Sequence, residues 1–275
     1  DWSSDVCSSD LTVVEFLILS WLLAALLMVR AWFFQRRYEN AAVVDVVWCG
    51  TLTVMVLVAA RATDGDPIRR ALVAAMVATW GFRLTWHVLA DRLVARPEDA
   101  RYRSLRRQWG GRANCYFFLV FQAEALGLPL FLLPALVLME NAQPVFSIWE
   151  WVGVALYFLA IGGEWVADGQ LARFRNDPAN RGKTCRSGLW RYSRHPNYFF
   201  ESLHWWAYVV MAVGLPYWWI TLIAPVLMTI SLLFISGIPL AEAQALASRG
   251  EDYRNYQRTT SAFIPWFPKD RKQVQ

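Results

Sequence analysis

The chain has 275 residues, of which 56% are hydrophobic and 18% are charged, whereas soluble domains carry about 25% charged residues. This composition and the 16 tryptophans exclude an ordinary soluble domain and predict an integral membrane protein with indole rings at the membrane interfaces. The net charge of +5 is too small to indicate a nucleic-acid partner. The four cysteines have no metal-ligand spacing, so we expect no metal site.

Long apolar segments predict an all-α bundle of seven transmembrane helices, because one span needs about 20 apolar residues. The expected spans are 11–34, 41–60, 71–93, 113–139, 148–172, 197–213 and 217–238. Residues 1–10 are polar and acidic and are interpreted as a disordered or non-native tail. We expect residues 11–275 to form a single membrane domain, with substrate-side helices at 11–147 and cofactor-binding helices and the tail at 148–275.

Basic residues concentrate in the segments 92–112, 173–194 and 249–272, whereas the loops 140–147 and 214–216 hold no Lys or Arg. Because positively charged loops stay in the cytoplasm, this pattern predicts an N-terminus outside and a C-terminus in the cytoplasm. An odd number of spans places the termini on opposite sides, which agrees with the charge pattern. The basic surface also suits contact with anionic membrane lipids.

The most informative stretch is Gly188–Glu201, which reads GLWRYSRHPNYFFE. A proline within it suits the first turn of a helix. Steps of four and three then place Asn197, Glu201 and His204 on one helix face. Tyr208 continues that stripe. Ionisable groups inside a membrane segment are costly and usually face a cavity or a partner, which favours a functional site over a mere interfacial anchor.

These residues resemble the C-terminal signature of the steroid 5-alpha-reductase family, specifically its bacterial relatives. Sterol reductases and isoprenylcysteine methyltransferases are broader relatives. The likeness extends over residues 149–268, and its last part, GEDYRNYQRTTSAFIPWFP at 250–268, is similar to the family's tail. The resemblance implies NADPH-dependent reduction of the conjugated C=C of a 3-oxo-Δ4 steroid or similar flat lipid enone, giving the 5α-reduced product. It also implies a monomer in the bacterial inner membrane, with a steroid or similar lipid as substrate.

The resemblance further implies that side chains hold the cofactor without a Rossmann domain, since the chain has no GxGxxG motif. Asp168, Arg175, Asn197 and Glu201 match positions that contact NADPH in the family. Glu164 stands where mammalian reductases have an amide. The other residues that we expect to bind the cofactor come from the basic loops and the tail: Arg106, Arg107, Lys183, Tyr192, Arg194, His195, Tyr253 and Tyr256.

For catalysis, a group must polarise the substrate's ketone while hydride adds to the β-carbon. Mammalian members use a Glu–Tyr pair, and the loose match places Asp45 near the Glu and Trp80 near the Tyr. We expect these two residues and Glu201 to be catalytic. A Trp N–H can donate a hydrogen bond but cannot relay a proton, whereas a protonated Asp can do both. Asp45 is equally interpretable as an interface acid, and Glu124 or Gln122 is the next candidate.

Two other functions compete with the reductase. A membrane methyltransferase that uses S-adenosylmethionine shares the HPxY-and-Glu architecture, but its cofactor is cationic, whereas NADPH needs several cations for its phosphates. A non-enzymatic lipid or sterol binder would not need the polar stripe of the sixth span. The density of arginine in the loops favours the nucleotide.

Overall fold

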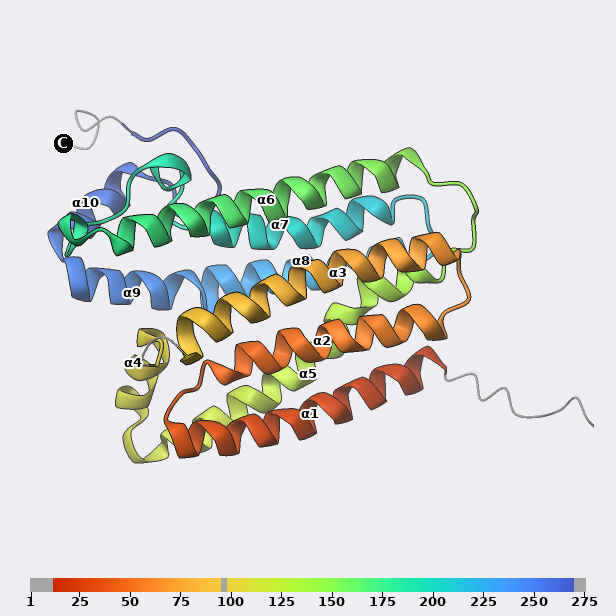
Figure 1. Cartoon of the computed structure of the whole chain (residues 1–275), viewed down its shortest axis with the longest axis horizontal. Helices are drawn as coiled ribbons and strands as arrows, with labels where there is room; N and C mark the ends of the chain where they lie inside the picture. Colours follow the sequence, from red (N-terminus) through yellow and green to blue (C-terminus); the bar gives the residue numbers. More distant parts are fainter. Residues whose placement is uncertain (1–11, 95–97, 270–275) are drawn as a thin grey trace, which may run out of the picture. The chain divides into compact units, whose positions relative to one another are not determined.

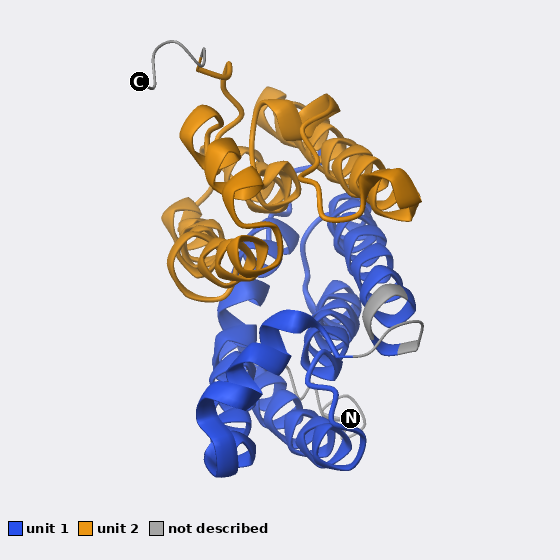
Figure 2. Cartoon of the chain, turned by 90° about the vertical axis from the view of Figure 1, so that its left-hand side faces the viewer, with its two compact units in different colours: residues 1–144 blue, residues 145–275 orange. Residues whose placement is uncertain are grey.

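The computed structural model describes residues 12–94 and 98–269, so the expected tail at 1–10 lies outside the described residues. In the described part every regular element is a helix, and one isolated parallel β-bridge joins Ser193 to Ser261 (Figure 1). The all-α prediction is therefore confirmed. The chain divides into two compact units, Asp1–Pro144 and Val145–Gln275, where the sequence predicted one domain with halves meeting at residue 147 (Figure 2).

Unit 1 is built from four long helices and one short basic helix. They are α1 Val13–Tyr38, α2 Val43–Ala62, α3 Pro67–Val88 with a π-helical turn at Leu89–Val94, α4 Ala100–Trp109, and α5 Ala113–Met139, preceded by a 3₁₀ turn at Gly110–Arg112. The Nε1 of Trp32 on α1 donates to the carbonyl of Asn114 at the start of α5, over 2.7 Å. This contact holds the C-terminal end of α1 against the N-terminal end of α5.

Unit 2 begins with a helical pair and ends with shorter helices. They are α6 Ile148–Asn176, a 3₁₀ turn Pro178–Asn180, a 3₁₀ turn Gly188–Arg191, α7 Pro196–Met211, a 3₁₀ turn Trp218–Leu222, α8 Ile223–Ile230 with a π-helical turn Ser231–Ile235, α9 Ile238–Arg249, and α10 Glu251–Thr259. As predicted, α7 begins at the proline of the HPN sequence, whose missing N–H is tolerated in the first turn.

Helices α6 and α7 lie side by side and antiparallel (Figure 1). A Cβ atom added at Gly153 would lie 2.3 Å from the Cγ of Met211, and one added at Gly163 would lie 2.4 Å from the ring of Phe200. The two glycines therefore allow a close helix–helix approach. These contacts fix the register of the pair, so each level of α6 has a known counterpart on α7.

Five helical segments of the described chain are long and apolar enough to cross a membrane, which indicates an integral membrane protein. They are Val13–Tyr38, Val43–Ala62, Ala100–Met139, Ile148–Asn176 and Trp218–Arg249. Two of the seven expected spans are not among these segments. The third coincides with α3, which carries Arg69, Arg70 and Arg83, and the sixth coincides with α7, which has 16 residues against the roughly 20 that a span requires.

Candidate functional site

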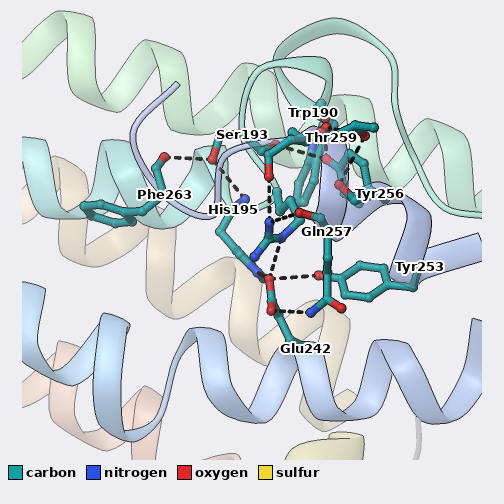
Figure 3. Close-up of polar contacts among 11 residues, drawn as sticks. Trp190, Ser193, His195, Glu242, Tyr253, Tyr256, Gln257, Thr259 and Phe263 are labelled. Atoms are coloured by element: carbon teal, nitrogen blue, oxygen red, sulfur yellow. Dashed lines mark hydrogen bonds and ion pairs between the residues drawn. The ribbon is translucent and has the colours of Figure 1, made fainter. Parts of the chain in front are cut away.

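A single carboxylate gathers polar groups from the loop before α7 and from α10. The Oε1 atom of Glu242 on α9 accepts from Arg194 Nε at 2.6 Å, His195 Nε2 at 3.2 Å and the hydroxyl of Tyr253 at 3.3 Å. Its Oε2 atom accepts from Gln257 Nε2 at 2.6 Å. Figure 3 shows these side chains converging on the carboxylate. All four of these hydrogen-bond donors to the Glu242 carboxylate are thus side chains of the protein.

The remaining hydrogen bonds of this network reach backbone carbonyls. Arg194 Nη1 donates to the carbonyl of Gln257 at 3.0 Å and to that of Thr260 at 2.6 Å. The hydroxyl of Tyr256 donates to the carbonyl of Trp190 (Figure 3). Arg194 and Tyr256 thus join the loop to the C-terminal segment, and their predicted contact with a cofactor stays a prediction.

We call this network the C-terminal clasp; its members are Arg194, His195, Glu242, Tyr253, Tyr256 and Gln257. Burial lowers the pKa of His195, and its hydrogen bond to Glu242 opposes that shift. Burial also raises the pKa values of Tyr253 and Tyr256, so both phenols stay protonated and act as donors. His195 stacks on the ring of Tyr198 at 5.4 Å. The clasp is chiefly a positioning device for the loop that leads into α7.

The paired helices α6 and α7 carry the polar groups that remain. Asn197 Nδ2 donates to Asp168 Oδ1 at 3.2 Å, which joins two of the predicted residues at the loop end of the two helices. One turn deeper, the register places Glu164, 4% exposed, opposite Glu201, 8% exposed. Glu201 Oε1 accepts from Trp205 Nε1 at 3.4 Å. The structure thus brings four of the predicted cofactor-binding residues to one seam between two helices.

One atom of this seam bears directly on whether a ligand fits. The side-chain oxygen of Asn197 is buried and has no hydrogen-bond partner among the described residues. A buried acceptor left unpaired destabilises the folded protein by about 1–3 kcal/mol, so such atoms usually have a ligand or water as partner. Together with the carboxylates of Asp168, Glu164 and Glu201, this oxygen suits a ligand rich in hydroxyl and amide donors. The ribose and carboxamide of a nicotinamide cofactor are of this kind.

Three other predicted residues of unit 2 lie at the C-terminal end of α6 and in the segment between α6 and α7. Arg175 and Lys183 are exposed, at the end of α6 and in the following loop. The carbonyl of Tyr192 accepts from the backbone N–H of Trp266 at 2.9 Å, and its ring meets Phe267 edge-on at 5.9 Å. Tyr192 therefore helps to hold the C-terminal segment, whereas the two cations are accessible to a phosphate.

The predicted residues of unit 1 have different surroundings. Arg106 Nη2 lies 2.8 Å from Glu98 Oε1 and 3.2 Å from Gln35 Oε1, so its guanidinium is already paired and joins α4 to α1. That Arg106 also binds a phosphate of the cofactor stays a prediction. Arg107, its neighbour, is exposed.

The predicted catalytic acid has a partner that the sequence analysis missed. The hydroxyl of Tyr102 on α4 donates to Asp45 Oδ1 on α2 at 3.0 Å, and Glu124 on α5 interacts electrostatically with the same acid. Trp80 is fully buried, and its ring centroid lies 6.3 Å from that of Trp48. In the sequence Tyr102 belongs to a basic segment without an apolar pattern. No spacing of residues therefore indicated that it would contact α2.

The sequence analysis also missed that Glu242 would be the common acceptor of these hydrogen bonds, although one feature of the sequence indicated it. It is the sole acid between residues 217 and 248, a segment that is otherwise apolar or neutral. A lone acid in such a segment needs cationic or hydrogen-bonding partners. The identity of those partners depends on how the tail folds back, which no local pattern shows.

The chain is similar to one protein family and to one yeast protein. The profile of the family described as "Protein of unknown function (DUF1295)" matches residues 31–260. An uncharacterized protein of Schizosaccharomyces pombe (strain 972 / ATCC 24843) is 27% identical over 164 residues, covering 50% of this chain and 46% of the yeast protein. The match thus spans about half the length of that relative. No solved structure matches the chain. Because the profile covers most of the chain, the protein belongs to the DUF1295 family, which is associated with steroid 5-alpha-reductase-like proteins.

Proposed function

We propose that the protein is an NADPH-dependent membrane reductase that reduces the conjugated C=C of a flat lipid enone, such as a 3-oxo-Δ4 steroid, to the 5α-reduced product. The observation that carries the proposal is the α6–α7 seam. Its buried acceptors include an Asn197 oxygen without a partner in the described part of the chain, which belongs to a family associated with 5-alpha-reductase-like proteins. A lipid substrate suits a protein with several long apolar helices.

The residues of unit 2 have distinct roles in this proposal. Asp168 and Asn197, with Glu164 and Glu201, accept hydrogen bonds from the hydroxyl and amide groups of the cofactor. Arg175 and Lys183, which are exposed, bind its phosphates. When bound, NADPH supplies the hydride for the reduction. The C-terminal clasp holds the loop that presents Asn197 at the start of α7.

The proposed ketone donor lies in unit 1. We keep Asp45 as the acid, with Trp80 beside its helix, and add Tyr102, whose hydroxyl already donates to Asp45. Hydride addition to the β-carbon moves the electron pair of the C=C towards the ketone oxygen. A hydroxyl donor at that oxygen stabilises the negative charge, and a proton delivered to the α-carbon completes the saturated ketone. A phenol, unlike an indole, can both donate and relay the proton.

We also keep the finer topology as part of the proposal: seven spans, an N-terminus outside, a C-terminus in the cytoplasm, and a location in the bacterial inner membrane. The basic segments at 92–112, 173–194 and 249–272 support it. In this arrangement α3 and α7 cross the membrane within the protein, where their polar residues face other helices.

A specific observation favours the methyltransferase as the second candidate. The seam holds three carboxylates, from Glu164, Asp168 and Glu201, and such a site also suits the cationic S-adenosylmethionine. In addition, Arg194 and Arg106 are paired within the protein, which reduces the number of cations that could face phosphates.

The deciding experiment measures binding of NADPH and of S-adenosylmethionine to the purified full-length protein in detergent. We expect NADPH to bind and Asn197→Ala to weaken it about five- to a hundred-fold, because a buried partner is lost. Asn255→Ala, at an exposed position of α10, is the matched control. Progesterone or testosterone supplied with NADPH should then give a 5α-dihydro product. Binding of S-adenosylmethionine alone would contradict the proposal and support the methyltransferase.

A further inference from the structure

The polar stripe of α7 continues beyond the residues assigned to the cofactor. Asn197, Glu201, His204 and Tyr208 follow one another in steps of four, three and four, so they lie on one helix face. Tyr208 is the innermost member of this stripe. Its counterpart on α6 is Tyr157, whose ring centroid lies 6.4 Å away.

Tyr208 is enclosed by aromatic rings, but these rings leave its hydroxyl without a hydrogen bond. The side chain is 1% exposed, and its ring centroid lies 5.8 Å from those of both His204 and Trp205. Its hydroxyl has no hydrogen-bond partner among the described residues. A Phe at this position would fill the same space without burying an unsatisfied polar group, so the hydroxyl is unfavourable for folding by itself.

The seam ends immediately beyond Tyr208. A Cβ atom at Gly153 would lie 2.3 Å from Met211 Cγ and 2.6 Å from the carbonyl oxygen of Ala207, so the helix backbones touch there. The two helices are therefore in direct contact at that level. From Asn197 to Tyr208 the helix rises about 16 Å, at roughly 1.5 Å per residue. Each end of this length carries one buried oxygen atom that has no partner within residues 12–94 and 98–269.

We propose that the hydroxyl of Tyr208 donates a hydrogen bond to the carboxamide oxygen of a nicotinamide cofactor that lies along the α6–α7 seam. The oxygen of Asn197 accepts a hydrogen bond from the outer part of the same ligand. A phenol is the donor that a carboxamide oxygen requires, and an amide oxygen is the acceptor that a ribose hydroxyl requires. The inference rests on the proposed function, and it assigns the inner end of the seam to the nicotinamide.

The test compares wild type, Tyr208→Phe and Tyr157→Phe as full-length proteins in detergent. The probes are NADPH and its thionicotinamide analogue, in which sulfur, a weaker acceptor, replaces the carboxamide oxygen. Wild type should bind NADPH at least about tenfold more tightly than the analogue, which is the usual scale of one hydrogen bond to a ligand. In Tyr208→Phe this preference should disappear. Tyr157→Phe, which removes the neighbouring phenol, should keep it.

Unfolding without ligand gives a second, independent measurement. We expect Tyr208→Phe to unfold at the same temperature as wild type or at a higher one, because it removes an unsatisfied hydroxyl. A lower unfolding temperature would show that the hydroxyl serves the fold, for instance through a buried water, and would overturn the inference. An unchanged preference for NADPH over the analogue would overturn it as well, while leaving the proposed function intact. A wild type that does not bind NADPH would overturn both.

Discussion

At the scale of single residues, the structure gives neighbouring polar side chains different partners. The sequence predicted that Arg194, His195 and Asn197, all within a few positions, would serve one cofactor site. The first two are directed to Glu242, whereas Asn197 points to Asp168 on α6. The sequence singled out this stretch because polar residues stand out in an apolar chain. The sequence could not predict the partner of each residue, because these partners lie on helices that are distant in sequence.

His195 should make the stability of the protein depend on pH. The pKa of His195 is lowered in the folded state. At a pH below the usual His pKa of about 6.5, the unfolded chain therefore binds a proton at this residue that the folded chain does not bind. The contribution of His195 to the free energy of unfolding should therefore be fully present above about pH 6.5 and be lost as the pH falls towards the lowered pKa. The measurement is the unfolding temperature of wild type and His195→Gln between about pH 5 and 7.5. The wild-type curve should fall more steeply; parallel curves would contradict this prediction.

Tyr102 should matter for turnover rather than for cofactor binding. Tyr102→Phe keeps the ring, whose centroid lies 6.3 Å from that of Phe117, but removes the hydroxyl that donates to Asp45. Loss of a proton donor typically slows a reaction by about 10²–10⁴-fold. We expect a fall of this order in kcat for enone reduction with the dissociation constant of NADPH unchanged. Tyr116→Phe, at an exposed position of α5, is the control, and full activity of Tyr102→Phe would place the donor elsewhere.

At the scale of helices, apolar length and turn residues predicted most elements of the chain. The long helices α1, α2, α5 and α6 lie where uninterrupted apolar runs required them. The short helices α4, α9 and α10 were not predicted, because their stability comes from packing and ion pairs rather than from an apolar run. The same reason explains the tail, whose helices are held by the clasp and by the ion pair between Arg186 and Asp252 at 2.7 Å.

The close approach of α6 and α7 can be tested with two glycines of the same helix. Gly153→Ala places a methyl group against the backbone of α7, whereas Gly162→Ala meets nothing within 4 Å. We expect the first change to destabilise the protein by about 1–3 kcal/mol, as overpacking does. The second should be neutral or stabilising by up to about 1 kcal/mol, since Ala favours a helix. Denaturant unfolding of both variants is the measurement; equal stabilities would show that the helices can separate freely.

At the scale of the whole molecule, the sequence predicted a helical membrane protein, and both the helices and their apolar length agree. The number of spans could not be settled by hydropathy. Polar residues on α3 and the short length of α7 reduce the signal wherever a helix faces other helices instead of lipid. The orientation stays a prediction from the charge of the loops.

Cysteine labelling tests that orientation. In a background without Cys7 and Cys115, Lys183→Cys should react with a membrane-impermeant maleimide only after the cells are opened. Gln143→Cys, in the loop on the opposite side, should react in intact cells. Position 183 is exposed in the structure, as is position 143, so both thiols would be accessible to the reagent. The reverse pattern would overturn the proposed topology, although not the fold.

The C-terminal clasp also has a consequence for how the protein is made. The loop before α7 is held by side chains and carbonyls that follow Arg194 by 48 to 66 positions. While the ribosome is still adding those residues, α7 can form, but the side chains of Arg194 and His195 lack their partner Glu242. The protein therefore passes through a stage of synthesis in which the α6–α7 seam exists but is not anchored. Early termination before residue 242 should leave a nascent chain that is exposed to quality-control proteases.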